Sequence, residues 1–293
     1  MNEARIVVGL GEVLWDVFPD GPRFGGAPAN FACHAAQLGA DARMASAVGN
    51  DELGNKALKA LQEKQVKTDC VRQMPYPTGT VTVQLDEAGK ASYEFAEDTA
   101  WDHLEWSEDL ANLAKQSSAV CFGTLGQRSE TSRKTIQRFV KAVPAETSLR
   151  VFDINLRPPF YTEEIILESL RLANVLKLND DELPILAKLC ELSGTDVEIM
   201  RELSQRYGLR LVALTRGNRG AVLCRDGKVS ESAGVETNVV DTVGAGDSFT
   251  AALVTGLLED RELDEINKAA CKIAAYVCSQ PGATPRIPDH LKP

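Results

Sequence analysis

The chain has 293 residues, and its 42 acidic against 32 basic side chains give a formal net charge of −10 at pH 7. Hydrophobic residues make up 44% of the sequence and charged residues 25%, the composition of an ordinary globular protein. The acidic balance argues against a nucleic acid or an anionic membrane as a partner, because both require a basic surface. No apolar stretch reaches the 18 or more residues of a membrane span, and the first residues lack the pattern of a signal peptide.

Seven cysteines are spread along the chain, at positions 33, 70, 121, 190, 224, 271 and 278, without any Cys-x-x-Cys pair. Most of them lie inside apolar segments, and their number is odd. Buried free thiols in a reducing compartment fit this pattern better than disulfides or metal ligands. We therefore expect a cytoplasmic protein.

The first 64 residues show a strand-and-helix pattern. A buried strand is predicted over Ile6–Leu14, and a helix of small residues begins near Pro28 and ends at Gly39. A further strand at 42–48 and an amphipathic helix at 51–64 follow. Each of these segments is typical of a βα protein.

The pattern then changes to short alternating runs between Thr68 and Phe95. A turn signal at Asp86–Gly89 separates two of these runs, which predicts an antiparallel hairpin. We expect a small β-sheet lid built from residues of about 12–25 and 68–100.

From residue 118 onward, strands and helices alternate regularly. Strands are predicted at 119–122, 149–154, 175–178, 211–214 and 221–224, and helices at 131–140, 163–172, 182–189, 196–207, 245–258 and 264–278. This alternation predicts a mostly parallel sheet covered by helices on both faces, a three-layer α/β/α architecture. We treat residues 1–293 as one domain, and we expect its ligands beyond the carboxyl ends of the strands.

The most informative segment, residues 241–247, reads DTVGAGD and precedes an apolar helix. Gly244 and Gly246 carry no side chains where the helix begins, so its first peptide N–H groups are free to bind an anion. Asp247 lies beside that site, where a carboxylate could take a proton from a hydroxyl that attacks a phosphoryl group. Alternatively, Asp247 only stabilises the helix N-terminus, by about 0.3–1 kcal/mol. The companion motifs lead us to favour the catalytic interpretation.

A second glycine pair, Gly25 and Gly26, leads into the predicted helix that carries Asn30. The glycines would allow a ligand to approach the backbone, and Asn30 offers a donor and an acceptor to hydroxyl groups. Upstream, the predicted strand leads to Asp16, a carboxylate of the kind that binds polyols. A tight turn followed by a helix start would explain the segment equally well if it stood alone.

Two further segments directly follow predicted strands. The acidic run Asn179–Glu182 either caps a helix or organises the water shell of a Mg²⁺ that carries nucleotide phosphates. The run Thr215–Gly220 suits phosphate contact but also fits a β-turn. A Walker loop, a protein-kinase signature and a dinucleotide fingerprint are all missing. The three histidines are too scattered for a metal cluster, and a structural role is expected for His34.

Together these motifs resemble the ribokinase-like (PfkB-type) carbohydrate kinases over nearly the whole chain, and the segment 241–247 matches a highly specific family motif completely. The resemblance implies a central sheet with a β lid, ATP and Mg²⁺ as cofactors, and Asp247 as the catalytic base. It further implies an anion hole formed by Gly244, Ala245 and Gly246, sugar contacts from Asp16, Gly25, Gly26 and Asn30, and phosphate and water-mediated Mg²⁺ contacts from Asn179 and Glu182. It also implies a nucleotide site at Thr215, Gly217 and Gly220, and a monovalent-cation (K⁺) site at Asp241, Val243 and Ala283.

Within the family, residues 15–30 and 95–102 look most like bacterial fructokinases. Residues 153–157 read DINLR and resemble the family's D-P-N-x-R stretch, with Ile154 in place of the usual proline. Phe95 and Arg157 are therefore expected at the sugar, although a surface ion pair would also explain Arg157.

The resemblance implies ATP-dependent transfer of the γ-phosphoryl group to a primary hydroxyl of a free sugar, with fructose favoured. Ribose, 2-keto-3-deoxygluconate or a nucleoside are alternative acceptors, and Phe24, Phe31 or Phe95 could stack on a nucleoside base. A non-catalytic sugar-binding protein is a third possibility, which the intact Asp247 disfavours. We also predict a homodimer through the lid, because exposed sheet edges tend to be covered.

Overall fold

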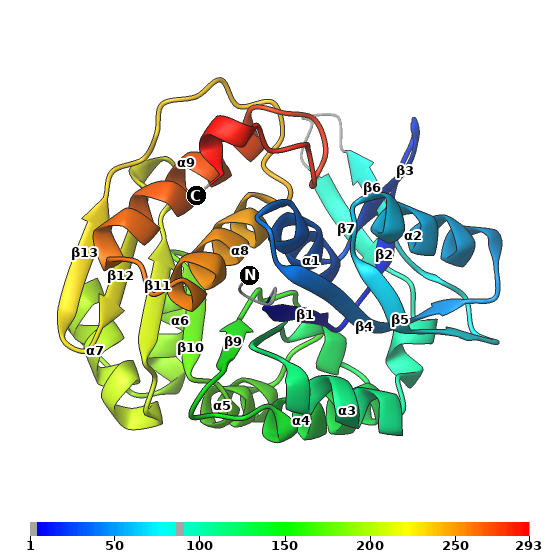
Figure 1. Cartoon of the computed structure of the whole chain (residues 1–293), viewed down its shortest axis with the longest axis horizontal. Coiled ribbons are helices and arrows are strands. Elements are labelled where there is room, and N and C mark those ends of the chain that lie inside the picture. Colours follow the sequence, from blue (N-terminus) through cyan, green and yellow to red (C-terminus); the bar gives the residue numbers. More distant parts are fainter. Residues whose placement is uncertain (1–4, 86–90, 293) are drawn as a thin grey trace.

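The structure is a computed structural model that describes residues 5–85 and 91–292. A nine-stranded sheet forms its centre (Figure 1). Its strands are, in spatial order, β13 (Lys228–Ser232), β12 (Ala221–Arg225), β11 (Leu211–Thr215), β10 (Val175–Asn179), β9 (Leu149–Asp153), β8 (Ala119–Phe122), β1 (Ile6–Leu10), β4 (Asp41–Gly49) and β5 (Lys67–Met74). The seven strands from β11 to β5 pair in parallel, and β12 and β13 are antiparallel.

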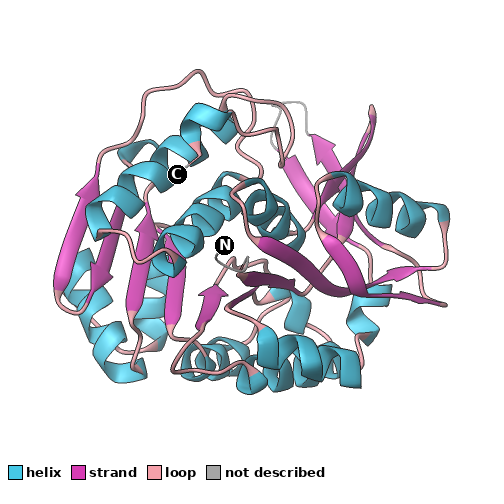
Figure 2. Ribbon diagram, in the orientation of Figure 1, coloured by secondary structure: helices cyan, strands magenta, loops and turns pink. Residues whose placement is uncertain are grey.

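Helices cover both faces of this sheet, as Figure 2 shows. One face carries α1 (Ala27–Gln37), α2 (Glu52–Glu63), α8 (Ala245–Leu258) and α9 (Leu263–Cys278), and the other carries α3 (Glu108–Gln116), α4 (Glu130–Ala142), α5 (Glu163–Leu172), α6 (Glu182–Leu189) and α7 (Asp196–Tyr207). Short 3-10 helices lie at Ala100–His103, Leu125–Gln127, Gly217–Arg219 and Asp289–Leu291. Successive strand residues point to opposite faces, so Val7 joins one apolar core and Val8 the other. The predicted three-layer architecture is confirmed.

A separate four-stranded sheet packs beside the large one. Its spatial order is β3 (Gly21–Gly25), β2 (Leu14–Phe18), β6 (Gly79–Leu85) and β7 (Ala91–Phe95). The outer pairs are antiparallel and the central pair β2–β6 is parallel. This is the expected small sheet, whereas the turn signal at 86–89 lies outside the described residues.

Two predicted boundaries are wrong. The strand predicted over Ile6–Leu14 is divided, because β1 ends at Leu10 and Gly11 adopts a φ of +142°. The chain then crosses to the small sheet, where β2 begins. The first part of the expected lid segment 68–100 belongs to β5, which pairs with β4 in the large sheet. As an edge strand, β5 alternates exposed and half-buried residues, so its sequence resembles a lid strand. Helix α3 and strand β13 were also not predicted.

A buried ion pair fixes the segment that leads from the small sheet back to the large one. Arg128 donates from Nε and Nη2 to the carboxylate of Asp102, at 2.8 and 2.6 Å, and from Nη2 to the Ala96 carbonyl at 2.6 Å. Its guanidinium also lies 4.0 Å from the centre of the Trp101 ring. The side chains of Arg128 and Asp102 are only 8% and 6% exposed. These contacts of Arg128, called the Arg128 clamp below, therefore hold Ala96, Trp101 and Asp102 in place where the chain leaves the small sheet.

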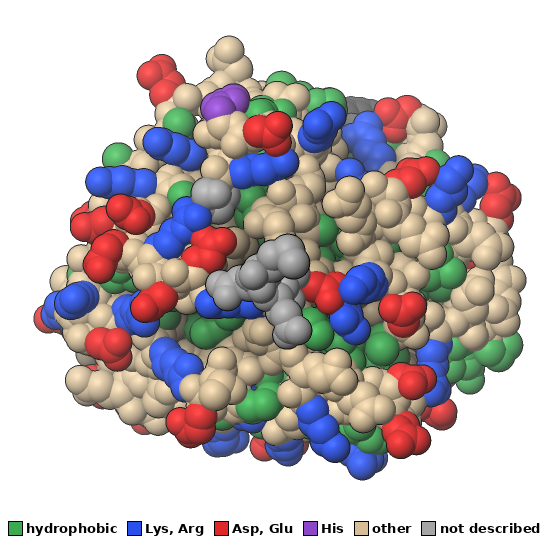
Figure 3. Space-filling model, viewed as in Figure 1, with side chains coloured by type: hydrophobic (Ala, Val, Ile, Leu, Met, Phe, Trp, Pro, Cys, Tyr) green, Lys and Arg blue, Asp and Glu red, His purple; other side chains and the backbone are tan. Residues whose placement is uncertain are grey.

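The surface charges and the free thiols are those that the sequence leads us to expect. On the face drawn in Figure 3, basic and acidic side chains are interspersed. All seven cysteine thiols are free. In the part of the chain that the structure describes, no helix combines the length and the hydrophobicity needed to cross a membrane.

Candidate active site

The turn at residues 244–246 forms the amino end of α8, as predicted. Gly244 precedes the helix with a φ of +79°, and a Cβ at this position would lie 2.1 Å from the Ala283 carbonyl oxygen. Only glycine fits there. The Ala245 amide donates a long 3.3 Å bond to the Thr242 carbonyl, so this donor is weakly engaged. The first N–H groups of a helix have no partner within it, so this turn has the geometry that suits an anion.

Asp247 lies in the first turn of α8 and is held by Asn30 of α1. Asn30 Nδ2 donates to Asp247 Oδ2 at 2.9 Å, which joins residues 217 positions apart in the sequence. Burial, and to a smaller extent the negative charge of Asp153, raise the pKa of Asp247 to about 6. The carboxylate is therefore ionised at neutral pH and still basic enough to accept a proton.

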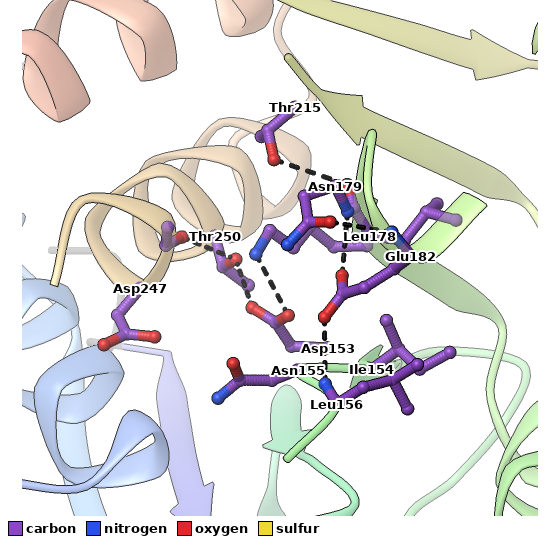
Figure 4. Close-up of polar contacts among 12 residues, drawn as sticks. Asp153, Ile154, Asn155, Leu156, Leu178, Asn179, Glu182, Thr215, Asp247 and Thr250 are labelled. Atoms are coloured by element: carbon purple, nitrogen blue, oxygen red, sulfur yellow. Dashed lines mark hydrogen bonds and ion pairs between the residues drawn. The ribbon is translucent and has the colours of Figure 1, made fainter. Parts of the chain in front are cut away.

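A buried ion pair beneath this turn was not predicted. Lys177 Nζ lies 3.1 Å from Asp153 Oδ1, and Thr250 Oγ1 donates to Asp153 Oδ2 at 2.9 Å (Figure 4). Asp153 and Asp247 both line one small cavity. The signal was present in the sequence, since Lys177 is a charged residue inside the apolar strand 175–178.

Gly25 and Gly26, which lead into α1, pack against acidic residues, so no open space is left for a side chain. A Cβ on Gly25 would lie 2.7 Å from Asp16 Oδ2, and one on Gly26 would lie 2.6 Å from the Glu12 carbonyl oxygen. Packing therefore excludes a side chain at both positions, and the contact with a sugar expected for these glycines stays a prediction. Burial raises the pKa of Asp16 to about 6, and the positive charge of Arg157 partly opposes this.

Glu12 is a second acidic residue that sequence reasoning did not assign. It lies where the chain crosses from β1 to the small sheet and is 2% exposed. Burial raises its pKa to about 7, and the charge of Asp247 adds to the shift. Its Oε2 has no hydrogen-bond partner among the described residues. Glu12, Asp16 and Asp247 thus make this part of the site acidic.

Residues 153–157 leave β9 and place Arg157 near these acids. Ile154 is fully buried, and the next residue, Asn155, adopts a φ of +39°. Arg157 is exposed and forms no ion pair with any described residue, so the surface ion pair considered above is not seen. Its positive charge lowers the pKa of Glu12, Asp16 and Asp247, against the effect of burial on all three.

The aromatic residues proposed for base stacking have different environments. Phe31 is 1% exposed and belongs to the core, so it cannot stack on a bound base. Phe24 packs edge-on against Trp15, with ring centres 5.6 Å apart. Phe95 packs edge-on against Phe160 at 5.2 Å and is half-buried. Phe24 and Phe95 are both half-buried, so each keeps some exposed surface that a ligand could contact.

The expected nucleotide residues lie at the ends of β10 and β11, where Asn179 pairs with Thr215. Asn179 Oδ1 accepts a hydrogen bond from the Glu182 amide at 2.9 Å. Glu182 Oε2 and Oε1 accept from the amides of Asn179 and Leu156, at 2.8 and 2.9 Å. Asn179 thus accepts from the first amide of α6, whereas the N-cap residue Asp181 makes no side-chain capping bond. The oxygens of Glu182 keep lone pairs for water, so an ion held through water fits them.

Gly217 and Gly220 differ in what requires a glycine. A Cβ on Gly220 would lie 2.0 Å from the Ser232 carbonyl oxygen, so packing excludes a side chain there. Gly217 has a φ of +54° and open space beside it. The loop is joined to the end of β10 by an ion pair between Arg219 and Asp180 at 2.7 Å.

The residues expected at a monovalent cation lie close together. Asp241 accepts hydrogen bonds from the amides of Val243 and Gly282, at 3.0 and 3.1 Å. The Ala283 carbonyl accepts from His34 Nε2 at 2.9 Å. Burial lowers the pKa of His34 to about 4, so the ring is neutral at pH 7 and plays the structural role predicted for it. Among the described residues, no group of three or more His, Cys, Asp or Glu side chains forms a metal cage.

The family model for pfkB family carbohydrate kinases matches residues 20–290. The chain belongs to this family. It is 32% identical over 279 residues to a sugar kinase of Pyrococcus horikoshii, covering 92% of this chain and 85% of that protein. It is 29% identical over 296 residues to a fructokinase of Escherichia coli, covering 95% of each chain.

Solved structures of pfkB relatives confirm the ribokinase-like fold. The sugar kinase of Pyrococcus horikoshii in complex with ATP gives a TM-score of 0.78 at 27% identity, over 95% of this chain and 94% of that one. A ribokinase II of Escherichia coli in complex with ATP and Mg²⁺ gives a TM-score of 0.82 at 20% identity, over 96% and 94% of the two chains. This carbohydrate kinase therefore shares its architecture with its relatives over nearly its whole length.

Proposed function

We propose that this pfkB-family kinase transfers the γ-phosphoryl group of ATP to a primary hydroxyl of free fructose. The observation that carries the proposal is the position of Asp247, which Asn30 holds at 2.9 Å beside the amide turn of α8. The same turn carries the free amides, so a base and an anion site lie within one helical turn. Phosphoryl transfer requires this alignment more than it requires covalent chemistry.

In the proposed reaction, Asp247 accepts the proton of the sugar hydroxyl as its oxygen attacks the γ-phosphorus. The bond from the γ-phosphorus to the bridging oxygen of ADP then breaks, and ADP leaves. The amides of Gly244, Ala245 and Gly246 stabilise the charge on the transferred group. Asp16 and Asn30 would bind sugar hydroxyls, with Phe95 as an apolar wall.

The nucleotide is proposed to lie over the ends of β10 and β11, near Asn179, Thr215 and Gly217. The loop before α8 exposes several valines to solvent, which suits an adenine base; they are Val235, Val239, Val240 and Val243. Bound Mg²⁺ would neutralise phosphate charge, with Glu182 holding its water shell. Asp241 and the carbonyls of Val243 and Ala283 are proposed to bind K⁺.

The charged residues around the proposed sugar site favour a neutral sugar as the acceptor. Three buried or partly buried carboxyl groups, those of Glu12, Asp16 and Asp247, belong to this site, and Arg157 is the cation that acts on all three, so an acidic acceptor would meet more repulsion than attraction. Arg157 has no ion-pair partner among the described residues, and it makes 2-keto-3-deoxygluconate the second candidate. The burial of Phe31 disfavours a nucleoside.

A coupled assay of ADP formation tests the acceptor. The panel comprises fructose, ribose, glucose, 2-keto-3-deoxygluconate and adenosine, each with and without K⁺. We expect kcat/KM for fructose to exceed each other value at least about tenfold, because one well-placed hydrogen bond discriminates by this factor or more. A higher value for another acceptor would overturn fructose alone. Sugar binding by calorimetry without ADP formation from any acceptor would overturn the kinase proposal.

A homodimer through the small sheet is part of the proposal. Strands β3 and β7 form the edges of this sheet, and Tyr93 on β7 is 59% exposed. Covering such an edge with a second copy removes unpaired backbone groups from water. Light scattering at micromolar concentration should give twice the chain mass of 31.8 kDa. A mass near that of one chain would contradict the dimer.

A cytoplasmic location completes the proposal. All seven thiols are free, and most of them are buried. This is the state expected in a reducing compartment.

A further inference from the structure

A buried ammonium group lies directly under the turn that is proposed to bind the phosphoryl group. Lys177 extends from the middle of β10, and its side chain is only 8% exposed. A Cβ placed on Gly246 would lie 3.0 Å from Lys177 Nζ, so the ammonium is in contact with the turn. A buried lysine is costly unless carboxylates compensate its charge.

Asp153 is the direct partner of this lysine and links it to the helix. Lys177 Nζ lies 3.1 Å from Asp153 Oδ1. Thr250 Oγ1 donates to Asp153 Oδ2 at 2.9 Å. The same hydroxyl oxygen lies 2.9 Å from the Gly246 carbonyl oxygen. The pair therefore ties the end of β9 and the middle of β10 to the start of α8, where Asp153 and Thr250 meet (Figure 4).

The lysine is charged at neutral pH despite its burial. Burial alone would lower the pKa of Lys177, but the carboxylates of Asp153, Glu182 and Asp247 outweigh it and raise that pKa. Only one of these carboxylates, Asp153, forms the direct ion pair. The other two are at the proposed reaction site, so the charge of Lys177 extends beyond its partner.

We propose that Lys177 is a positioning residue for phosphoryl transfer, which holds the Gly244–Gly246 turn and keeps a fixed positive charge beneath it. This inference rests on the proposed kinase reaction. The transferred group carries negative charge on its three equatorial oxygens while its bond to ADP breaks, and a preorganised positive charge in a buried site stabilises it strongly. The protein as a whole has a charge of −10 and cannot supply this potential.

The charge of Lys177 also acts on the proposed base. It lowers the pKa of Asp247, against burial and the charge of Asp153. The other groups that face Asp247 are Asn30 in the first turn of α1, Glu12 between β1 and β2, Arg157 after β9, and Cys121 on β8. Without Lys177, Asp247 would titrate above its value of about 6, and the acid limb of the kcat profile would move to higher pH.

The test compares Lys177→Met with the wild type, and Asp153→Asn with the double variant Asp153→Asn/Lys177→Met. We expect Lys177→Met to lower kcat by about 10²–10³-fold, as loss of one oxyanion-hole donor does. KM for the sugar should stay within about twofold, and the acid limb should move upward. Lys188→Met, an exposed lysine on α6, is the matched control and should change none of these values.

The double variant separates a catalytic effect from a structural one. Lys177→Met leaves Asp153 buried without its partner and could unfold the protein, whereas the double variant removes both charges. A double variant with at least about tenfold lower kcat than Asp153→Asn would support the proposal. Equal kcat in these two proteins would show that Lys177 only neutralises Asp153, and would overturn it. So would wild-type kcat and an unmoved acid limb in folded Lys177→Met.

A readout without turnover distinguishes failure of this inference from failure of the proposed function. ADP with aluminium fluoride and fructose mimics the transferred phosphoryl group. Lys177→Met should bind this mixture at least about tenfold more weakly than the wild type, and ADP alone within about twofold. If the wild type binds the mixture and Lys177→Met binds it equally, the role of Lys177 is refuted. If the wild type neither binds it nor forms ADP, the kinase proposal itself fails, and this inference fails with it.

Discussion

Replacing Asp247 by asparagine is expected to lower kcat by about 10²–10⁴-fold, the usual contribution of a general base. Asparagine has nearly the same shape, and its amide oxygen can still accept the hydrogen bond from Asn30 that the carboxylate accepts at 2.9 Å. It cannot take a proton from the sugar hydroxyl. Coupled ADP formation measures the loss, and calorimetry should show sugar binding within about threefold of the wild type.

The fold should survive this substitution. Burial raises the pKa of Asp247 to about 6, so the ionised carboxylate is less favourable in the folded state than in the unfolded chain. At pH values above 6 the charge therefore lowers stability, and Asp247→Asn should unfold at the wild-type temperature or higher. Asp264→Asn is the matched control, an exposed acid in the first turn of α9. If both variants keep near-normal kcat, Asp247 only stabilises its helix terminus and is not the base.

Replacing Arg128 by alanine is expected to lower the free energy of unfolding by about 3–5 kcal/mol, as removal of one partner from a buried ion pair does. The substitution leaves Asp102 buried without its guanidinium, which now donates to it at 2.8 and 2.6 Å. It also removes the contact with Trp101 at 4.0 Å. Urea unfolding at pH 7 measures the loss.

Arg138→Ala is the matched control for this clamp. Arg138 is also an arginine that lies over a tryptophan, at 4.5 Å from the ring of Trp106, but it is exposed. Its removal should cost no more than about 1 kcal/mol. Equal losses in the two variants would show that the ion pair with Asp102 contributes nothing beyond the aromatic contact.

Local patterns predicted the parts of the site that depend on neighbours in sequence. The glycines around Ala245 and the acid at Asp247 lie within a few residues, so a turn and a helix start could be predicted from them directly. The same holds for α1, which begins beside Pro28 and ends before Gly39.

Features that depend on distant packing could not be predicted in this way. Nothing in the apolar run from Ile6 to Leu14 shows that the chain changes sheets at Gly11, because both halves are buried. The β5 segment has the alternation of any edge strand, and only its pairing with β4 assigns it to the large sheet. The close packing of Gly25 against Asp16 and of Gly26 against the Glu12 carbonyl was likewise not evident from the sequence. These outcomes are decided by tertiary contacts, which local propensity does not encode.

The hydrogen bond between Asn30 and Asp247 spans 217 positions, and α1 packs against α8 (Figure 1). The last strand of the large sheet ends at Ser232, so the sheet can assemble on a nascent chain before the proposed base, Asp247, has been synthesised. Activity then requires α8 to pack against α1, the first helix of the chain. Such a contact forms slowly because it joins segments that are far apart in the sequence. During refolding, ADP-forming activity should consequently return later than strand content, and its recovery reports this closing step.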